Sequence, residues 1–447
     1  MASPLVNLRE KEYLEIKKTF HKQGVKYFSF FCEESRYTAF EFFSDNSINF
    51  LTKFISGLGI TLFQDNRLAH RAYSKDKLYL LERELGIKED LFFFEGKREQ
   101  EEKQDSLDKY IDSVGIEKNK RIRNIRILKR KLDQQVWAGN IYGNFGHEKR
   151  VWVQYKVQAF VKYKDDIIEL ERGGGFSKDN EFHLKHYLED LIKISDGVIS
   201  NAKEINFGGE IPIILSSGEG NVLFHEVLGH PLESDYVIHN ISPIKMKMLN
   251  QKIAPDFLTV FDLGSIDQER SCFKLDDEGF ITKSKILIEN GVLRNFITDG
   301  ISLLIYQSGS GGNSRRESFL YPPLPRVSSL SIREGKYDEQ EMIESIKKGI
   351  FINKLGNGEI KIQNGYFSFQ IKESFFIENG KLKFPLVGGY IKGNLWSLLE
   401  NIEMIGKNKK FDSGLGYCRK KGQNLIVRVS GPSIKIKKLF YYSKKWS

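Results

Sequence analysis

The clearest pattern in the chain is an alternation of apolar and polar positions around residues 150–163. In RVWVQYKVQAFVKY every second residue, from the first valine to the last tyrosine, is apolar or aromatic. A period of two is typical of a strand with one buried face. The turn residues KDD and a second run, IIELE, follow directly, so we predict an antiparallel hairpin. We expect the glycines of the next stretch, RGGGF, to form a flexible segment.

Helical patterns flank this strand region. Residues 8–23 and 75–85 look helical, and the short apolar run 26–32 lies between them. Residues 179–204 carry apolar side chains at spacings of three to five, which predicts a longer helix. A helix of that length could join two domains, so we place a domain boundary near residue 205.

Beyond that boundary, short apolar runs alternate with turn-forming segments such as NG, DDEG and ENGK. The stretch SFFIENGKLKFPL is the clearest hairpin, because Asn379 and Gly380 suit a type I′ turn. A similar stretch, KILIENGVLRNF, begins at Lys285. We therefore expect an α+β fold: an N-terminal α/β domain over 1–204, with helices packed on a sheet, and a C-terminal domain over 205–447 dominated by antiparallel sheet.

Charge and composition narrow the functional classes. The net charge is +10, and its densest stretch, KNKRIRNIRILKRK at 118–131, interleaves bases with isoleucines and lacks aromatic stacking residues. This favours an element with one solvated face over a nucleic-acid site. The sequence has no run of 18 apolar residues and no apolar core of a secretory signal, so we expect a cytoplasmic protein that does not bind membranes. Cys32, Cys272 and Cys418 are widely spaced, which fits a reducing compartment.

The segment FHEVLGHPLESD, from Phe224, carries two histidines with the spacing HExxxH. On a regular α-helix, residues five apart differ in direction by about 140°, so His225 and His230 would face different ways. A π-bulge, or an end of the helix before His230, would realign them. Gly229 and Pro231 favour such a local break. Neutral imidazoles bind Zn²⁺ well, and the carboxylate of Glu226 beside the first imidazole could reach water at the metal, which indicates a zinc centre.

Catalytic zinc usually has three protein ligands. Glu233, Asp235 and His239 lie nearby in the sequence, whereas Cys418 is remote but sits among glycines in DSGLGYCRKKGQ. A thiolate with two imidazoles is a known catalytic set. The residues alone leave the choice open between Glu233 and Cys418.

At this point the sequence resembles the TldD/PmbA metallopeptidases, in particular the TldD branch that keeps HExxxH. The resemblance rests on FHEVLGHPLESD, KLDDEGF, GGNSRRES with the following PPLPR, and GLGYCRKKGQ, all in the same order along 215–434. This range covers about half of the chain. Pro231 and Arg419 stand where the family commonly has glycine, and VSGPS replaces its usual GQP segment.

The resemblance implies that zinc is held by His225, His230 and Cys418, with Glu226 as the catalytic base. Glu233 and Asp235 then become candidates for orienting the imidazoles. Arg315 and Arg316, in GNSRRES, are candidates for binding substrate or a developing oxyanion.

The implied activity is hydrolysis of peptide bonds in unfolded or flexible peptides, by a homodimer or by a heterodimer with a PmbA-like subunit. Two other functions compete with this one. A noncatalytic binding or scaffold subunit, associated with nucleic acid, would use the basic stretch 118–131. A zinc hydrolase of non-peptide amides would use the same metal site.

Overall fold

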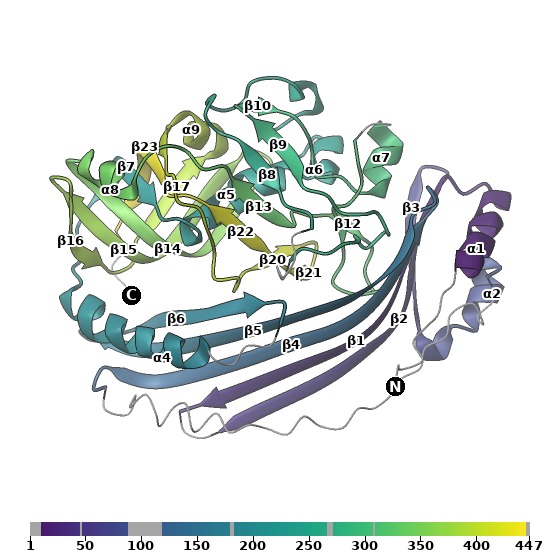
Figure 1. Cartoon of the computed structure of the whole chain (residues 1–447), viewed down its shortest axis with the longest axis horizontal. Helices are drawn as coiled ribbons and strands as arrows, with labels where there is room; N and C mark the ends of the chain where they lie inside the picture. The colour runs from purple at the N-terminus through teal and green to yellow at the C-terminus, as the bar shows by residue number, and fades with distance from the viewer. Residues whose placement is uncertain are drawn as a thin grey trace.

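The computed structural model describes residues 10–44, 47–87, 119–178, 183–265, 271–306 and 309–443. Six long, sequentially antiparallel strands form one curved sheet that lies beneath the C-terminal half in Figure 1. Their order across the sheet is β3 (Arg67–Ser74), β2 (Ile48–Gln64), β1 (Tyr27–Phe43), β4 (Ile122–Asn140), β5 (Phe145–Tyr163) and β6 (Asp166–Phe176).

The helices of the N-terminal half pack on one face of this sheet. At one end, α1 (Glu10–Lys22) and α2 (Leu80–Leu85) pack around Trp137, and at the other end α4 (His183–Lys193) packs on Ile125 and Ile127. These three residues of β4 have odd numbers and share one face, because side chains alternate along a strand. On the opposite face, Val136 packs against Phe319 of the C-terminal half.

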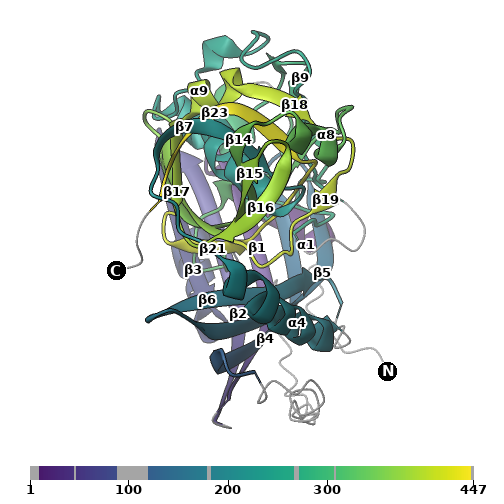
Figure 2. The same ribbon diagram turned by 90° about the vertical axis from the view of Figure 1, so that its left-hand side faces the viewer.

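In the C-terminal half, one sheet closes into a ring. The pairings run from β14 through β7, β23, β17 and β15 and then return from β15 to β14. Figure 2 looks into this ring, whose interior holds much of the largest hydrophobic core. The strands of the ring are β7 (Gly208–Leu215), β14 (Lys348–Lys361), β15 (Tyr366–Glu378), β17 (Tyr390–Asn394) and β23 (Ile434–Tyr442). Two further strands, β16 (Lys381–Leu386) and β18 (Ile402–Ile405), flank them.

A second sheet lies beside the ring, and its strand β22 pairs in parallel with β13. Its strands are, in order, β10 (Val292–Leu293), β9 (Lys285–Glu289), β8 (Val260–Asp262), β13 (Ser329–Ile332), β22 (Arg428–Gly431) and β19 (Lys410–Phe411). Two small hairpins complete the strands: β11 (Ser314–Arg315) with β12 (Leu324–Pro325), and β20 (Tyr417–Lys420) with β21 (Gln423–Ile426). Short helices connect them: α5 (Val222–Phe224), α6 (Ser234–Ile238), α7 (Gly300–Tyr306), α8 (Glu339–Glu344) and α9 (Leu395–Glu400).

The expected α+β class is confirmed, and so are the main hairpins. Strands β5 and β6 pair across the predicted turn, and Asn379 and Gly380 have φ of 49° and 73°, as a type I′ turn requires. The prediction of a flexible RGGGF was wrong, because these residues belong to β6 and pair with β5. The linker helix is described from residue 183 onward and changes to a π-turn, Ile194–Val198, and a 3₁₀ turn, Ile199–Asn201. The division at residue 205 stays a prediction.

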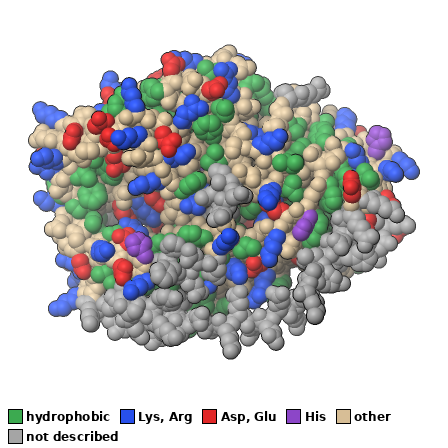
Figure 3. Space-filling view, viewed as in Figure 1, with side chains coloured by type: hydrophobic (Ala, Val, Ile, Leu, Met, Phe, Trp, Pro, Cys, Tyr) green, Lys and Arg blue, Asp and Glu red, His purple; other side chains and the backbone are tan. Residues whose placement is uncertain are grey.

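The basic stretch belongs to β4 from Ile122 onward, and Lys118 lies outside the described residues. Arg126 pairs with Glu41, and Lys131 lies 3.4 Å from Asp133. On the face drawn in Figure 3, Lys and Arg side chains are scattered among acidic and hydrophobic ones. In the part of the chain that is described, no helix is long and apolar enough to cross a bilayer.

Candidate metal centre

The two motif histidines lie on a helix that changes its winding between them. The α-helical turn α5 passes into a π-turn over His225–Gly229, and a 3₁₀ turn over His230–Leu232 follows. The backbone N–H of His230 donates to the carbonyl of His225, which is the i to i+5 bond of a π-turn. Pro231 occupies the start of the 3₁₀ turn, where its missing N–H costs nothing. The two imidazole centroids are therefore only 5.1 Å apart, although the residues are five apart in sequence.

Gly229 fits this turn for reasons of space. Its φ of −60° is open to any residue, but a Cβ built on it would lie 2.9 Å from a methyl group of Val327 and 3.3 Å from one of Leu330. The helix that carries the histidines thus packs against the strand region around β13 more closely than a side chain would allow.

We expect Gly229→Ala to lower the free energy of unfolding by about 1–3 kcal/mol, because the added methyl group overpacks a closely packed contact. Gly197→Ala is the matched control, since Gly197 also lies in a π-turn and a Cβ there meets nothing within 4 Å. Urea denaturation of both variants measures the difference. Equal stability of the two variants would contradict the packing argument.

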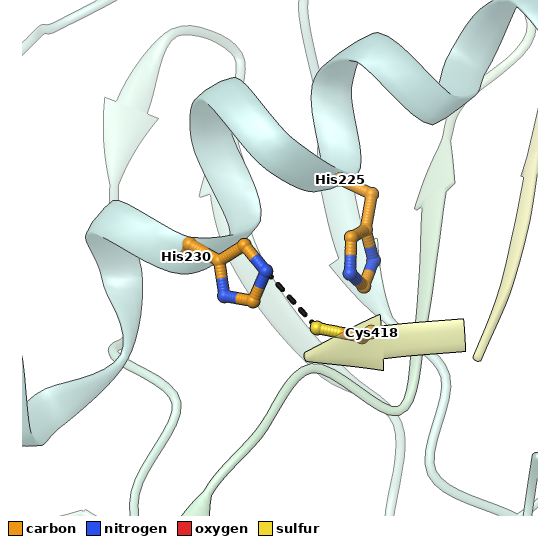
Figure 4. Close-up of side chains that lie close together, drawn as sticks. All are labelled: His225, His230 and Cys418. Carbon is orange, nitrogen blue, oxygen red and sulfur yellow. Dashed lines mark hydrogen bonds between the residues drawn. The ribbon is translucent and has the colours of Figure 1, made fainter. Parts of the chain in front are cut away.

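Cys418 reaches the histidines from a strand far away in sequence. It lies on β20, whose hairpin with β21 turns at Lys421 and Gly422, both with positive φ. Its Sγ lies 3.1 Å from Nε2 of His230, and one donor atom from each of His225, His230 and Cys418 lies within 4.8 Å of the others. Figure 4 shows the sulfur pointing at the two rings from the opposite side.

The chemistry of this cluster fits a zinc ion. All three residues are buried, and neither ring nitrogen of His225 has a hydrogen-bond partner among the described residues. Leaving a buried polar group unpaired costs about 1–3 kcal/mol, so a missing partner is expected at this position. Two imidazole nitrogens and a sulfur form a donor set that zinc prefers.

The two neighbouring histidines lower the pKa of Cys418, which favours the thiolate form of its sulfur. Burial by itself would raise the pKa of Cys418, but His230 and His225 outweigh it and lower this pKa to about 5. The thiolate is the form of cysteine that binds metals. Burial likewise works to lower the pKa of His230, whereas Glu233 and Cys418 raise it above the usual range.

Glu233 holds the imidazole of His230 from behind. Nδ1 of His230 lies 3.0 Å from Oε2 of Glu233, so its N–H donates to this carboxylate and Nε2 is the ring nitrogen that faces the sulfur. Burial would raise the pKa of Glu233, but Lys420 and His230 outweigh it and hold this pKa well below its usual value. Asp235 accepts hydrogen bonds from Lys420 and from Lys421 rather than from a histidine.

Glu226 lies at the accessible side of the cluster. Its Oε2 is 3.4 Å from Nε2 of His230, and its side chain keeps 27% of its surface exposed, against 7% for His230. A carboxylate that is both close to the donor atoms and open to solvent can exchange a proton with water.

The side chains of Arg315 and Arg316 in GNSRRES make hydrogen bonds to backbone carbonyls outside the histidine–cysteine cluster. Arg316 donates to the carbonyls of Asp277 and Tyr321, and Arg315 donates to the carbonyl of Ser271. No hydrogen bond among the described residues joins either arginine to the histidines or to Cys418.

Another arginine, which the sequence analysis did not single out, reaches the site. Nη2 of Arg326 donates to the carbonyl of Cys418 at 2.6 Å, and Lys420, two residues after Cys418, contacts Glu233. Lys420 could have been found from the alternation of β20, which puts residues 418 and 420 on one face. Arg326 is the last residue of the PPLPR stretch that carries the family resemblance, but nothing in that stretch predicts its contact with Cys418.

Comparisons with known proteins identify the family of the chain. Residues 208–441 match the family model described as the PmbA/TldA metallopeptidase C-terminal domain. A metalloprotease TldD homolog from Buchnera aphidicola is 30% identical over 317 residues, which cover 68% of this chain and 65% of that protein. A zinc metalloprotease TldD homolog from Saccharolobus solfataricus is 35% identical over 232 residues, 52% of this chain and 51% of that protein. The chain thus matches about half to two thirds of the length of these relatives.

Solved structures share the whole fold at low sequence identity. TldE from Thermococcus kodakarensis superposes with a TM-score of 0.73 at 18% identity, over 96% of this chain and 100% of that one. A protein from Thermotoga maritima, described in connection with modulation of a DNA gyrase, gives 0.74 at 16% identity over 97% and 99%. With the family model covering the half of the chain that carries His225, His230 and Cys418, this protein belongs to the TldD/PmbA family of metallopeptidases.

Proposed function

We propose that this protein is a zinc-dependent peptidase that hydrolyses peptide bonds in unfolded or flexible peptides. His225, His230 and Cys418 hold the metal, and Glu226 is the general base. The observation that supports this most strongly is the convergence of two imidazoles and a sulfur, from segments 188 residues apart, on one buried point where both ring nitrogens of His225 are unpaired.

Zinc bound at this point would supply Lewis acidity, which polarises a scissile carbonyl and makes water a better nucleophile. Glu226 takes a proton from the attacking water, because its carboxylate is close to the donor atoms and open to solvent. It then returns this proton to the departing amine, so that the carboxylate is regenerated in each cycle. A thiolate ligand donates charge to the metal, which makes a general base more necessary than with three imidazoles.

Other residues support the ligands. Glu233 accepts a hydrogen bond from Nδ1–H of His230 and thereby orients the ring so that Nε2 is presented to the metal. Asp235 supports the site indirectly, through its ion pairs with Lys420 and Lys421. A substrate role for Arg315 and Arg316 stays a prediction. Arg315 donates to the carbonyl of Ser271, and Arg316 donates to the carbonyl of Asp277.

The substrate class and the assembly state are also part of the proposal. A peptide reaches such a centre in an extended form, because folded proteins keep their scissile bonds packed away. The proposed assembly is a dimer, either with a second copy of this chain or with a PmbA-like subunit, as the family resemblance implies. We expect the reaction to take place in the cytoplasm.

Cleavage of an unfolded peptide mixture tests the function. We expect the zinc-loaded protein to produce new peptide termini, detected by mass spectrometry, and a chelator to stop their appearance. Re-addition of zinc should restore cleavage. A zinc-loaded protein that leaves peptides intact but hydrolyses small non-peptide amides would favour the alternative of an amidase. Failure with both substrate classes would favour the noncatalytic subunit.

A further inference from the structure

Lys420 is a buried cation beside the metal cluster that the reaction as proposed does not use. Its side chain is 1% exposed. Its ammonium group donates to Glu233 Oε2 at 2.9 Å, to Asp235 Oδ1 at 2.6 Å and to the carbonyl of Pro325 at 3.0 Å. Because an ammonium group has three N–H donors, each one has an acceptor and the group is held in one position.

These contacts connect the two elements that carry the metal ligands. Lys420 and Cys418 lie on the same face of β20, since residues two apart on a strand point the same way. Through Glu233, Lys420 reaches Nδ1 of His230 on the kinked helix. The link from the cysteine strand to the histidine ring is therefore a row of hydrogen bonds and ion pairs, independent of any metal.

The segment 325–327 also contacts each of the three residues in this link, Lys420, Cys418 and Glu233. Three consecutive residues contact the three participants: the carbonyl of Pro325 accepts from Lys420, Nη2 of Arg326 donates to the carbonyl of Cys418, and the backbone N–H of Val327 donates to Oε1 of Glu233. Both oxygens of Glu233 are thus bound, with Oε2 shared by His230 and Lys420.

We propose that Lys420 is a positioning residue of the metal centre. It holds Glu233 against Nδ1 of His230, so that Nε2 of this ring and the sulfur of Cys418 are aligned before the metal arrives. The inference rests on the proposed metal site. Its physical basis is that a buried carboxylate whose cation is removed must find another partner or move, and the imidazole that depends on it then loses its orientation.

Zinc affinity of Lys420→Met, measured by competition with a chromophoric chelator, tests this role. Loss of a residue that supports a metal ligand typically costs about 10–100-fold in affinity, and we expect a decrease in this range. Lys421→Met is the matched control, because Lys421 is an exposed neighbour that pairs with Asp235 at 3.2 Å but has no contact with Glu233 among the described residues. Its zinc affinity should change by less than about twofold, as exposed pairs contribute little.

A double variant keeps the test decisive where Lys420→Met alone fails to fold. Glu233→Gln together with Lys420→Met leaves no unpaired buried charge. If Lys420 acts through Glu233, this double variant loses no more zinc affinity than Glu233→Gln alone. Additive losses would overturn the inference. In cobalt-loaded protein, the visible bands should shift for Lys420→Met and stay in place for Lys421→Met, a change that a general loss of stability does not produce.

Crystal structures of the metal-free variants separate this inference from the proposed function. In Lys420→Met we expect a rotated His230 ring and loss of its 3.0 Å contact with Glu233, and in Lys421→Met an unchanged ring. If wild type binds zinc and Lys420→Met binds it equally well, the positioning role is wrong and the peptidase proposal stands. If wild type binds no zinc, the peptidase proposal fails. In that case, the orientation of the His230 imidazole in the metal-free variants still tests whether Lys420 holds this side chain in place.

Discussion

Replacement of Glu226 by glutamine is expected to reduce kcat/KM for peptide cleavage by about 10²–10⁴-fold, the range that a general base contributes. Glutamine has nearly the same shape as glutamate but cannot take a proton from water. The three donor residues remain, so zinc content should stay at the wild-type level. Initial rates on an unfolded peptide and metal analysis of the same preparation measure both quantities.

The control for this change is Glu210→Gln, an exposed carboxylate on β7 that pairs with Lys438, away from the cluster. Its rate should equal that of wild type. A Glu226→Gln protein that loses its zinc would show that this carboxylate is a metal ligand instead of a base. Unchanged activity with full zinc content would remove Glu226 from the reaction.

Replacement of Cys418 by serine is expected to weaken zinc binding by more than about 100-fold, because loss of a mere supporting partner already costs roughly 10–100-fold. A neutral hydroxyl replaces a sulfur whose low pKa, about 5, makes it the thiolate that zinc binds. Peptide cleavage should fall to background at zinc concentrations that saturate the wild type. Equilibrium dialysis against a zinc buffer gives the affinity.

Cys272→Ser is the matched control, because Cys272 is half-buried, lies outside the cluster and contacts the carbonyl of Leu263. Its zinc affinity and its activity should be those of wild type. If Cys418→Ser kept full zinc and full activity, the third ligand would have to be sought among other residues, and Glu233 would be the first to test.

The local shape of the histidine motif could be predicted from the sequence because it depends on neighbouring residues. A five-residue spacing between histidines does not fit a regular helix, and Gly229 with Pro231 indicates where the helix changes. The structure has both of the expected solutions, a π-turn over His225–Gly229 and a 3₁₀ turn from His230 onward. The type I′ turn at Asn379 and Gly380 was predictable because it also depends on neighbouring residues, and few residue types adopt positive φ.

Local chemistry does not choose the third member of the proposed metal site, because glutamate and cysteine are both good zinc ligands. The choice depends on how β20 packs against the kinked helix, which is a contact between segments 188 residues apart. Glu233 contacts Nδ1 of His230, and the sulfur of Cys418 contacts Nε2. The two residues therefore contact different nitrogens of the same imidazole. Only the resemblance to a known family favoured Cys418 beforehand.

Two further expectations depended on tertiary structure in the same way. Glycines in RGGGF suggested flexibility, but Gly173 and Gly174 pair with β5 and lie where a Cβ would clash, at Gly173 with the backbone carbonyl of Tyr155. Close packing against a neighbour, rather than freedom, explains these glycines. Arg315 and Arg316 were chosen for their charge, and their partners at Ser271 and Asp277 could not be read from the sequence.

The distance along the chain between the helix ligands and the sulfur also has a consequence for biosynthesis. A ribosome adds about 5–20 residues per second, so the 188 residues from His230 to Cys418 take roughly 10 to 40 s to make. During that interval the growing polypeptide carries two imidazoles and a carboxylate but not the donor that completes the set. On the proposed function, peptide cleavage therefore begins only after β20 has joined the helix, and an unfinished chain leaves neighbouring nascent chains intact.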